Sequence, residues 1–99
     1  MQNIVKTDTT FSKLCYEYVE TKKKKARLKR RLRRLRGEKR EPVLEELRKV
    51  NIELYKAVVR IEMHPTFKAL LLEYPIHTIW RTVIPQIAKE YAKEVKKNE

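Results

Sequence analysis

The chain has 99 residues, 38% of them charged, and a net charge of +12, which indicates one small, strongly basic domain over residues 1–99 with a thin core. Its single cysteine, Cys15, excludes an internal disulfide and any zinc site with two or more thiolates. The longest apolar run, Ala69–Leu72, is far shorter than the roughly 20 residues of a membrane helix, and Met1–Thr10 lacks the apolar stretch of a signal peptide. We therefore expect an intracellular protein without a membrane partner.

The first predicted element is a long helix. Met1–Thr10 shows no hydrophobic period, so we expect it to fray, with Thr10 as the N-cap of the helix that follows. Apolar residues then recur at helical spacing from Phe11 to Leu35. Gly37 stands where such a helix ends. The pattern predicts a helix of about 25 residues, roughly 38 Å long.

A second helix follows the short polar connection Glu38–Glu41, and Pro42 suits its first turn. Its apolar residues repeat at heptad spacing: Val43, Leu47, Val50, Leu54, Ala57 and Ile61. His64-Pro65 ends the helix, because a residue before proline avoids the α conformation. So short a connection makes the two helices antiparallel neighbours, so we expect the Leu28/Leu32/Leu35 seam to meet Val43, Leu47 and Val50.

Two C-terminal helices complete an all-α prediction. We expect Thr66 to cap a short helix over Phe67–Tyr74, with four residues facing inward: Phe67, Leu70, Leu71 and Tyr74. A longer helical stripe follows Pro75, with Trp80 central: Ile76, Ile79, Trp80, Val83, Ile84, Ile87, Ala88, Tyr91 and Val95. Pro85 would kink that helix or start a new one. A strand over Ile76–Ile84 stays open as an alternative, because the segment is rich in β-branched residues.

Residues 21–40 carry the whole net charge of the chain. They hold thirteen Lys or Arg and one acid, Glu38, whereas the other residues hold twelve of each sign. A strongly basic segment in an otherwise neutral chain favours a polyanion as the binding partner, and nucleic acid is the commonest polyanion. The candidate nucleic-acid-binding residues are Lys22, Lys23, Lys24, Lys25, Arg27, Lys29, Arg30, Arg31, Arg33, Arg34, Arg36, Lys39 and Arg40.

The expected mode is contact with the DNA or RNA backbone without reading of bases. Arginine holds a phosphate with two parallel hydrogen bonds, and residues 10–50 contain no Asn or Gln to read adenine edges. Gly37 and Pro42 interrupt the continuous helix that a basic leucine zipper needs. A helix-turn-helix over Thr66–Tyr91 is disfavoured, because its turn has no Gly and Arg81 is the only base between Ile76 and Ala88. The alternatives are a protein-interaction or assembly module, in which the basic helix docks an acidic partner, and a membrane-surface helix, which the narrow apolar seam disfavours.

Other side chains offer little chemistry. His64, His77 and Cys15 show no ligand spacing, so we expect no metal and no cofactor, and Cys15 reads as a small buried apolar residue. Without a Gly-rich loop or a nucleophile beside a base, we expect no enzyme. Tyr16 and Tyr18, next to the basic run, are candidates for stacking on bases.

The heptad seam also suggests self-association. Val43–Ile61 is longer than the Leu28–Leu35 seam it would face, so we expect a homodimer in which another chain completes it. Many Lys, Arg and Glu residues with only five Asn plus Gln are typical of thermostable proteins.

The length of 99 residues, this Lys/Arg/Glu enrichment and the basic helix Lys22–Arg36 before Pro42 resemble those of small uncharacterised proteins of filamentous viruses that infect hyperthermophilic, acid-loving archaea. The resemblance implies a phase in the host cytoplasm and tolerance of heat and acid. It brings no functional residue with it.

Overall fold

The computed structural model describes residues 9–97, and all regular structure in that range is helical, as predicted. The elements in chain order are α2 (Thr9–Arg34), the 3₁₀ helix η1 (Gly37–Lys39), α3 (Arg40–Met63), α4 (Pro65–Leu71), α5 (Ile76–Thr78), the π-helical turn η2 (Ile79–Val83) and α6 (Ile84–Lys97). The strand considered over Ile76–Ile84 is therefore wrong. Residues 1–8, the bulk of the segment expected to fray, lie outside the described residues.

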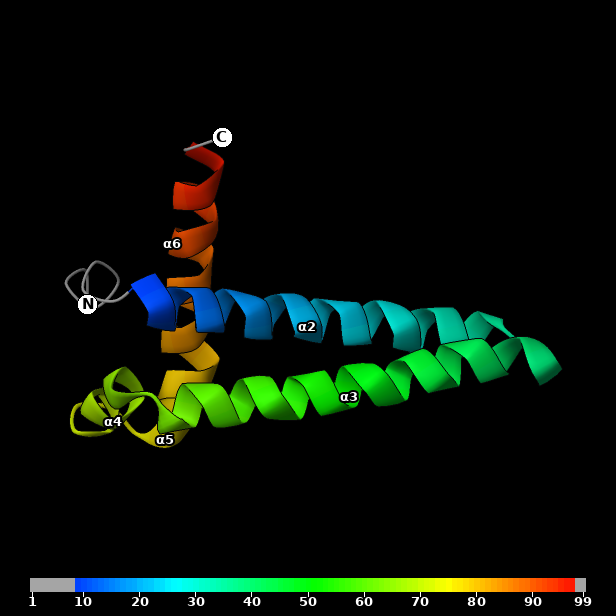
Figure 1. Ribbon diagram of the computed structural model, residues 1–99, viewed down its shortest axis with the longest axis horizontal. Coiled ribbons are helices and arrows are strands. Elements are labelled where there is room, and N and C mark those ends of the chain that lie inside the picture. The colour runs from blue at the N-terminus through cyan, green and yellow to red at the C-terminus, as the bar shows by residue number, and fades with distance from the viewer. Residues whose placement is uncertain (1–8, 98–99) are drawn as a thin grey trace.

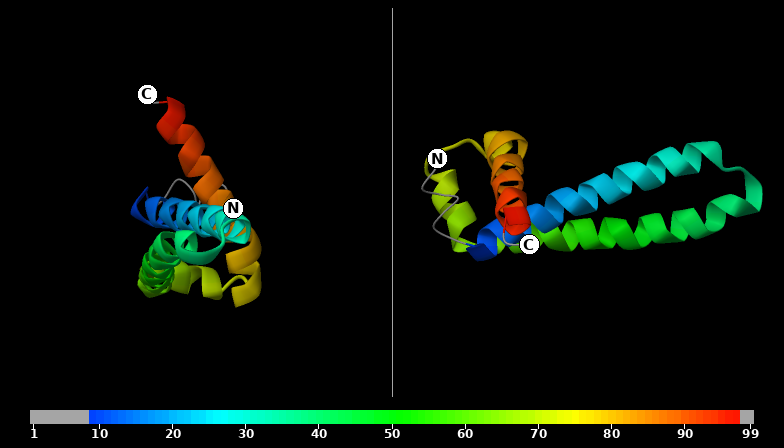
Figure 2. Two further views of the ribbon diagram at one scale, coloured as in Figure 1. Left: turned by 90° about the vertical axis from the view of Figure 1, so that its right-hand side faces the viewer. Right: turned by 90° about the horizontal axis from the view of Figure 1, so that it is seen from above.

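The long helix α2 packs against both α3 and α6, and it does so with different halves (Figure 1). Its first half carries Phe11 and Cys15, which are buried with Ile61 of α3, Phe67 of α4 and Ile84 of α6 in the main core. Its second half extends beside α3, away from α4, α5 and α6, as Figures 1 and 2 show. The longest dimension of the protein, 50 Å, follows this extension.

A second, smaller apolar cluster lies in the extension. Leu28, Val43 and Val50 are buried there, and three partly buried leucines pack against them: Leu32, Leu35 and Leu47. These are the residues that the two heptad seams were predicted to bring together. The two seams thus bury one another over this stretch within a single chain, and farther along the longer seam Ala57 and Ile61 are also buried, whereas Leu54 is half-buried.

The connection at the end of the extension depends on Gly37. The last residue of α2 is Arg34, Arg36 is extended with φ −134° and ψ 151°, and Gly37 has φ 64°. This left-handed conformation suits glycine, and it turns the chain into η1 and α3. Glu38–Glu41, predicted as a simple connection, is helical: its last two residues already belong to α3.

Two predicted caps are corrected by the structure. Thr10 lies inside α2 and does not cap it, because the helix already includes Thr9. α4 is capped by His64, whose Nδ1 accepts a hydrogen bond from the Thr66 backbone N–H at 3.1 Å, so Thr66 is the capped residue and not the cap. Pro65 occupies the first helical position, where its missing N–H costs nothing.

The C-terminal helical segment runs through Pro85 without a break. η2 widens the backbone just before the proline, and the Ile84 N–H donates to the Ile79 carbonyl, five residues back. A π turn relieves the clash between a proline ring and the preceding carbonyls, and Pro85 itself has no N–H that needs a partner. α6 begins at Ile84, one residue before Pro85, the position at which the sequence predicted a new helix could start.

Several residues predicted to face the core lie at the surface or at its edge, Val95 at 39% exposure among them. Trp80 is half-buried and not central; its ring lies 5.0 Å from the Tyr18 ring and 5.7 Å from the Phe67 ring, centroid to centroid. Leu71 and Ile76 are 44% and 50% exposed. Both lie next to the turns that join α4 to α5, where the chain curls away from the core.

Candidate nucleic-acid interface

The predicted binding residues fall on the extension, and we call Lys22–Arg40 the basic arm. Its charge is one-sided. α2 holds eleven Lys or Arg and two Glu, a net charge of +9, whereas α3 holds five bases and five acids and is neutral. The cationic helix α2, which carries most of the basic arm, therefore packs against the electrically neutral helix α3.

The cations of the basic arm are open to solvent. Of the thirteen predicted residues, twelve are exposed and Lys25 is half-buried. Within residues 9–97, their single ion pair joins Lys23 Nζ to Glu20 Oε2 at 3.2 Å, and Lys22 Nζ lies 5.5 Å from the centre of the Tyr18 ring. The sequence reasoning missed Glu20, although its i,i+3 spacing from Lys23 was a visible signal.

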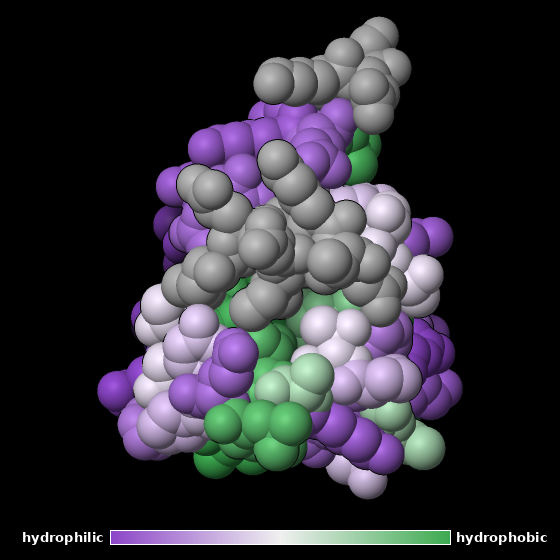
Figure 3. All heavy atoms as spheres, turned by 90° about the vertical axis from the view of Figure 1, so that its left-hand side faces the viewer, coloured by the Kyte–Doolittle hydropathy of each residue, from purple (hydrophilic) through white to green (hydrophobic). Residues whose placement is uncertain are grey.

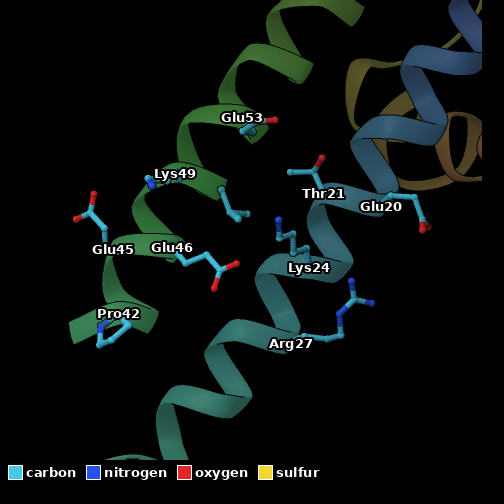
Figure 4. Close-up of a pocket in the computed structure, with 10 residues that line it drawn as sticks. Glu20, Thr21, Lys24, Arg27, Pro42, Glu45, Glu46, Lys49 and Glu53 are labelled. Carbon is cyan, nitrogen blue, oxygen red and sulfur yellow. The ribbon is translucent and has the colours of Figure 1, made fainter. Parts of the chain in front are cut away.

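The carboxylates of α3 do not neutralise the arm. An open groove of about 750 Å³ lies between α2 and α3, and Figure 4 shows its lining. Four glutamates line it with three bases, and they are Glu20, Glu45, Glu46, Glu53, Lys24, Arg27 and Lys49. Within residues 9–97, the α3 glutamates of this lining form one ion pair, which joins Glu45 to Arg48 of the same helix. The four acids and three bases of the groove nearly balance, whereas, in the described part of the chain, the outer surface of α2 carries exposed bases with no acid of α3 beside them.

The tyrosines near the arm are engaged in the core. The Tyr16 ring packs on Tyr91 at 5.4 Å between centroids, and the Tyr18 ring packs on Trp80 at 5.0 Å. Both tyrosines are half-buried. Each ring thus packs on one aromatic side chain of α6 or η2, which leaves less of it open for stacking on bases. Among the aromatic residues in 9–97, Tyr55 alone is exposed, at 71%, and it lies on α3.

The remaining candidates carry structural roles. Cys15 is fully buried, and desolvation raises the pKa of its thiol from 9.0 to about 12, which makes it unreactive at neutral pH. His64 caps α4 and its ring lies 5.1 Å from that of Phe11. In residues 9–97, His, Cys, Asp and Glu form no group of three or more that could hold a metal ion.

None of the helices in residues 9–97 combines the length and the hydropathy that crossing a bilayer requires. No family model matches the chain, and neither the curated proteins nor the solved structures compared with it give a match.

Proposed function

We propose that this protein binds nucleic acid through the phosphate backbone, without sequence specificity, and that it is not an enzyme. The observation that carries the proposal is the basic arm: twelve exposed cations with one ion pair among the described residues. We infer that α2 and α3 form an antiparallel helical hairpin in which α3 serves to hold α2 straight. Leu28, Val43 and Val50 provide that support from one side of α2 and leave its other sides to the ligand.

The energetics of the arm favour an anionic ligand. Like charges three or four residues apart on a helix destabilise it by a few tenths of a kcal/mol per pair, and the arm contains many such pairs. Bound phosphates relieve this repulsion and release the counterions condensed on the nucleic acid. If about six phosphates are neutralised, the affinity for duplex DNA falls with salt at a log–log slope near −5.

The test compares two variants with the same loss of charge. The arm variant replaces Arg27, Arg30, Arg31 and Arg34 with Gln, and the control variant replaces Arg48, Lys49, Lys56 and Arg60 of α3 with Gln. All eight side chains are exposed, so both variants should fold. Binding to duplex DNA is measured by electrophoretic mobility shift at increasing salt, with circular dichroism as the check on folding.

We expect the arm variant to lose about three to four phosphate contacts, and thus to lower the magnitude of the salt slope by roughly 3, while the control variant stays close to wild type. Equal losses in both variants would show that only net charge matters and that the arm is not the site. If the wild type fails to retard DNA at low salt, the proposed function is wrong.

A second candidate, an assembly module, is favoured by exposed apolar side chains on the neutral part of the molecule. Ile52, Tyr55 and Met63 are 56%, 71% and 71% exposed and share one face of α3, while Leu72, just after α4, is 89% exposed. Figure 3 shows hydrophobic surface in the lower part of the end where α4 lies. Such surface often marks a protein contact. A homodimer would use these faces instead of the buried seams; analytical ultracentrifugation measures it directly.

A further inference from the structure

Six of the exposed bases of α2 lie in two rows on opposite flanks of the helix. Each residue advances about 100° around an α-helix, so positions seven, four or three apart share a flank. The first row is Lys22, Lys29 and Arg33, and the second row is Arg27, Arg31 and Arg34. Between them, on the side opposite to Leu28, lie Lys23, Ala26 and Arg30. All nine side chains are exposed.

Two cationic rows, one on each flank of a single helix, match a groove with a phosphate backbone on each side. An α-helix with its side chains is about 10–12 Å across, and the major groove of B-form DNA is about 12 Å wide. In that groove each row meets one strand, and the face with Ala26 and Arg30 points to the groove floor. A helix resting on one backbone would use one row and leave the other in solvent.

The position of α3 is compatible with this arrangement. α3 covers the Leu28 side of α2, opposite to the face that would enter the groove. The groove between the two helices is lined by four glutamates and three bases, Arg27 of the second row among them, so a duplex that approaches the outward half of α2 does not have to pass the carboxylates of α3. No element other than α3 flanks the second half of α2 in Figures 1 and 2.

Other nucleic acids fit the arm less well. The major groove of A-form RNA is too deep and narrow for side chains to reach in. Single strands gain affinity from bases stacked on aromatic rings, but the basic arm contains no aromatic residue. Tyr16 and Tyr18, which precede the arm, are covered by Tyr91 and Trp80.

Resting on the proposed function, we propose that α2 inserts its outward face into the major groove of B-form duplex DNA, with one lateral row on each strand. The ligand class is thus double-stranded DNA, in preference to double-stranded RNA or single strands. The two rows contact phosphates on both sides of the groove, and the short Ala26 side chain lets the helix approach the groove floor.

Competition and footprinting test the choice of ligand. One fluorescent DNA duplex is displaced by unlabelled DNA duplex, RNA duplex or single-stranded DNA of the same sequence. Dimethyl sulfate then methylates guanine N7 in the major groove and adenine N3 in the minor groove. We expect the DNA duplex to compete at least tenfold better than the others, with protection of guanine N7 and not of adenine N3. Equal competition, or protection of adenine N3 alone, overturns this inference while the proposed function stands; absence of all binding overturns both.

Removing one row at a time tests the two-strand geometry. Lys22, Lys29 and Arg33 are replaced with Gln in one variant, and Arg27, Arg31 and Arg34 in the other. Each variant loses three exposed charges from the same helix, so each is the matched control of the other. If each row meets one strand, both lower the magnitude of the salt slope by about three. A full loss in one variant and none in the other would place α2 along a single backbone and refute the groove.

Discussion

Replacing Gly37 with Ala tests how the connection at the end of the basic arm is made. Gly37 has φ 64°, and a Cβ at this position would meet no atom within 4 Å, so the cost is set by the backbone alone. A non-glycine residue in the left-handed region costs about 1–2 kcal/mol. The reduced freedom of the unfolded chain returns about 0.4–1 kcal/mol of this. We expect a net loss of about 1 kcal/mol in the free energy of unfolding, or about 4–8 °C in Tm for a domain of this size.

Thermal melts followed by circular dichroism at the helical band measure this loss. Two further substitutions of Gly37 test whether the backbone conformation, and not a side-chain contact, sets this loss of stability. Gly37→Asn should lose less, because asparagine enters the left-handed region more readily, and D-alanine, introduced by ligation, should stabilise the protein, because a D-residue favours positive φ. A Gly37→Ala protein that melts with the wild type, or a D-alanine protein that melts below it, would refute the left-handed turn.

Three further predictions concern stability. Leu28→Ala should lower the free energy of unfolding by about 2–3 kcal/mol, because Leu28 is 5% exposed in a small cluster that water can reach. The control Leu72→Ala, at a position that is 89% exposed, should change it by less than about 0.5 kcal/mol. Equal effects of the two substitutions in chemical denaturation would contradict the second apolar cluster. Because burial raises the pKa of the Cys15 thiol from 9.0 to about 12, the unfolded chain loses this proton first, so stability should fall by about 1.4 kcal/mol per pH unit between those values, relative to Cys15→Ala. A thiol reagent should label Cys15 only after denaturant is added, and rapid labelling of the folded protein would contradict its burial.

The long helices could be predicted because their apolar periods are regular. The heptad spacing from Val43 to Ile61 and the helical spacing from Phe11 to Leu35 each allow one buried face, and the structure buries those faces. The predicted positions of the helix ends were less accurate. The identity of a cap depends on which local hydrogen bond forms. The sequence allowed either His64 or Thr66 as the N-cap of α4, and the structure has the His64 side chain accept the bond.

The C-terminal part was harder to predict because proline and crowding act together there. The sequence shows that Pro85 disturbs the helix, but it does not show whether the backbone accommodates the proline with a kink or with a π turn. The exposure of Leu71 and Ile76 likewise depends on where the turns after α4 place them, which no periodicity specifies.

The charge of the candidate site was visible in the sequence, whereas its shape was not. Thirteen bases within residues 21–40 are read directly from the chain. Their sorting into two flanks depends on the position of the Leu28 seam against α3, and the occupation of Tyr16 and Tyr18 depends on contacts with Tyr91 and Trp80, far along the chain.

The salt dependence of DNA binding by the unmodified protein tests the central claim most directly. Fluorescence anisotropy with a duplex of about 20 base pairs gives the affinity at each salt concentration from about 50 to 200 mM. An arm that neutralises about six phosphates predicts a log–log slope near −5 over this range. A slope near zero, or no binding at the lowest salt, would contradict a phosphate-binding role for the basic arm.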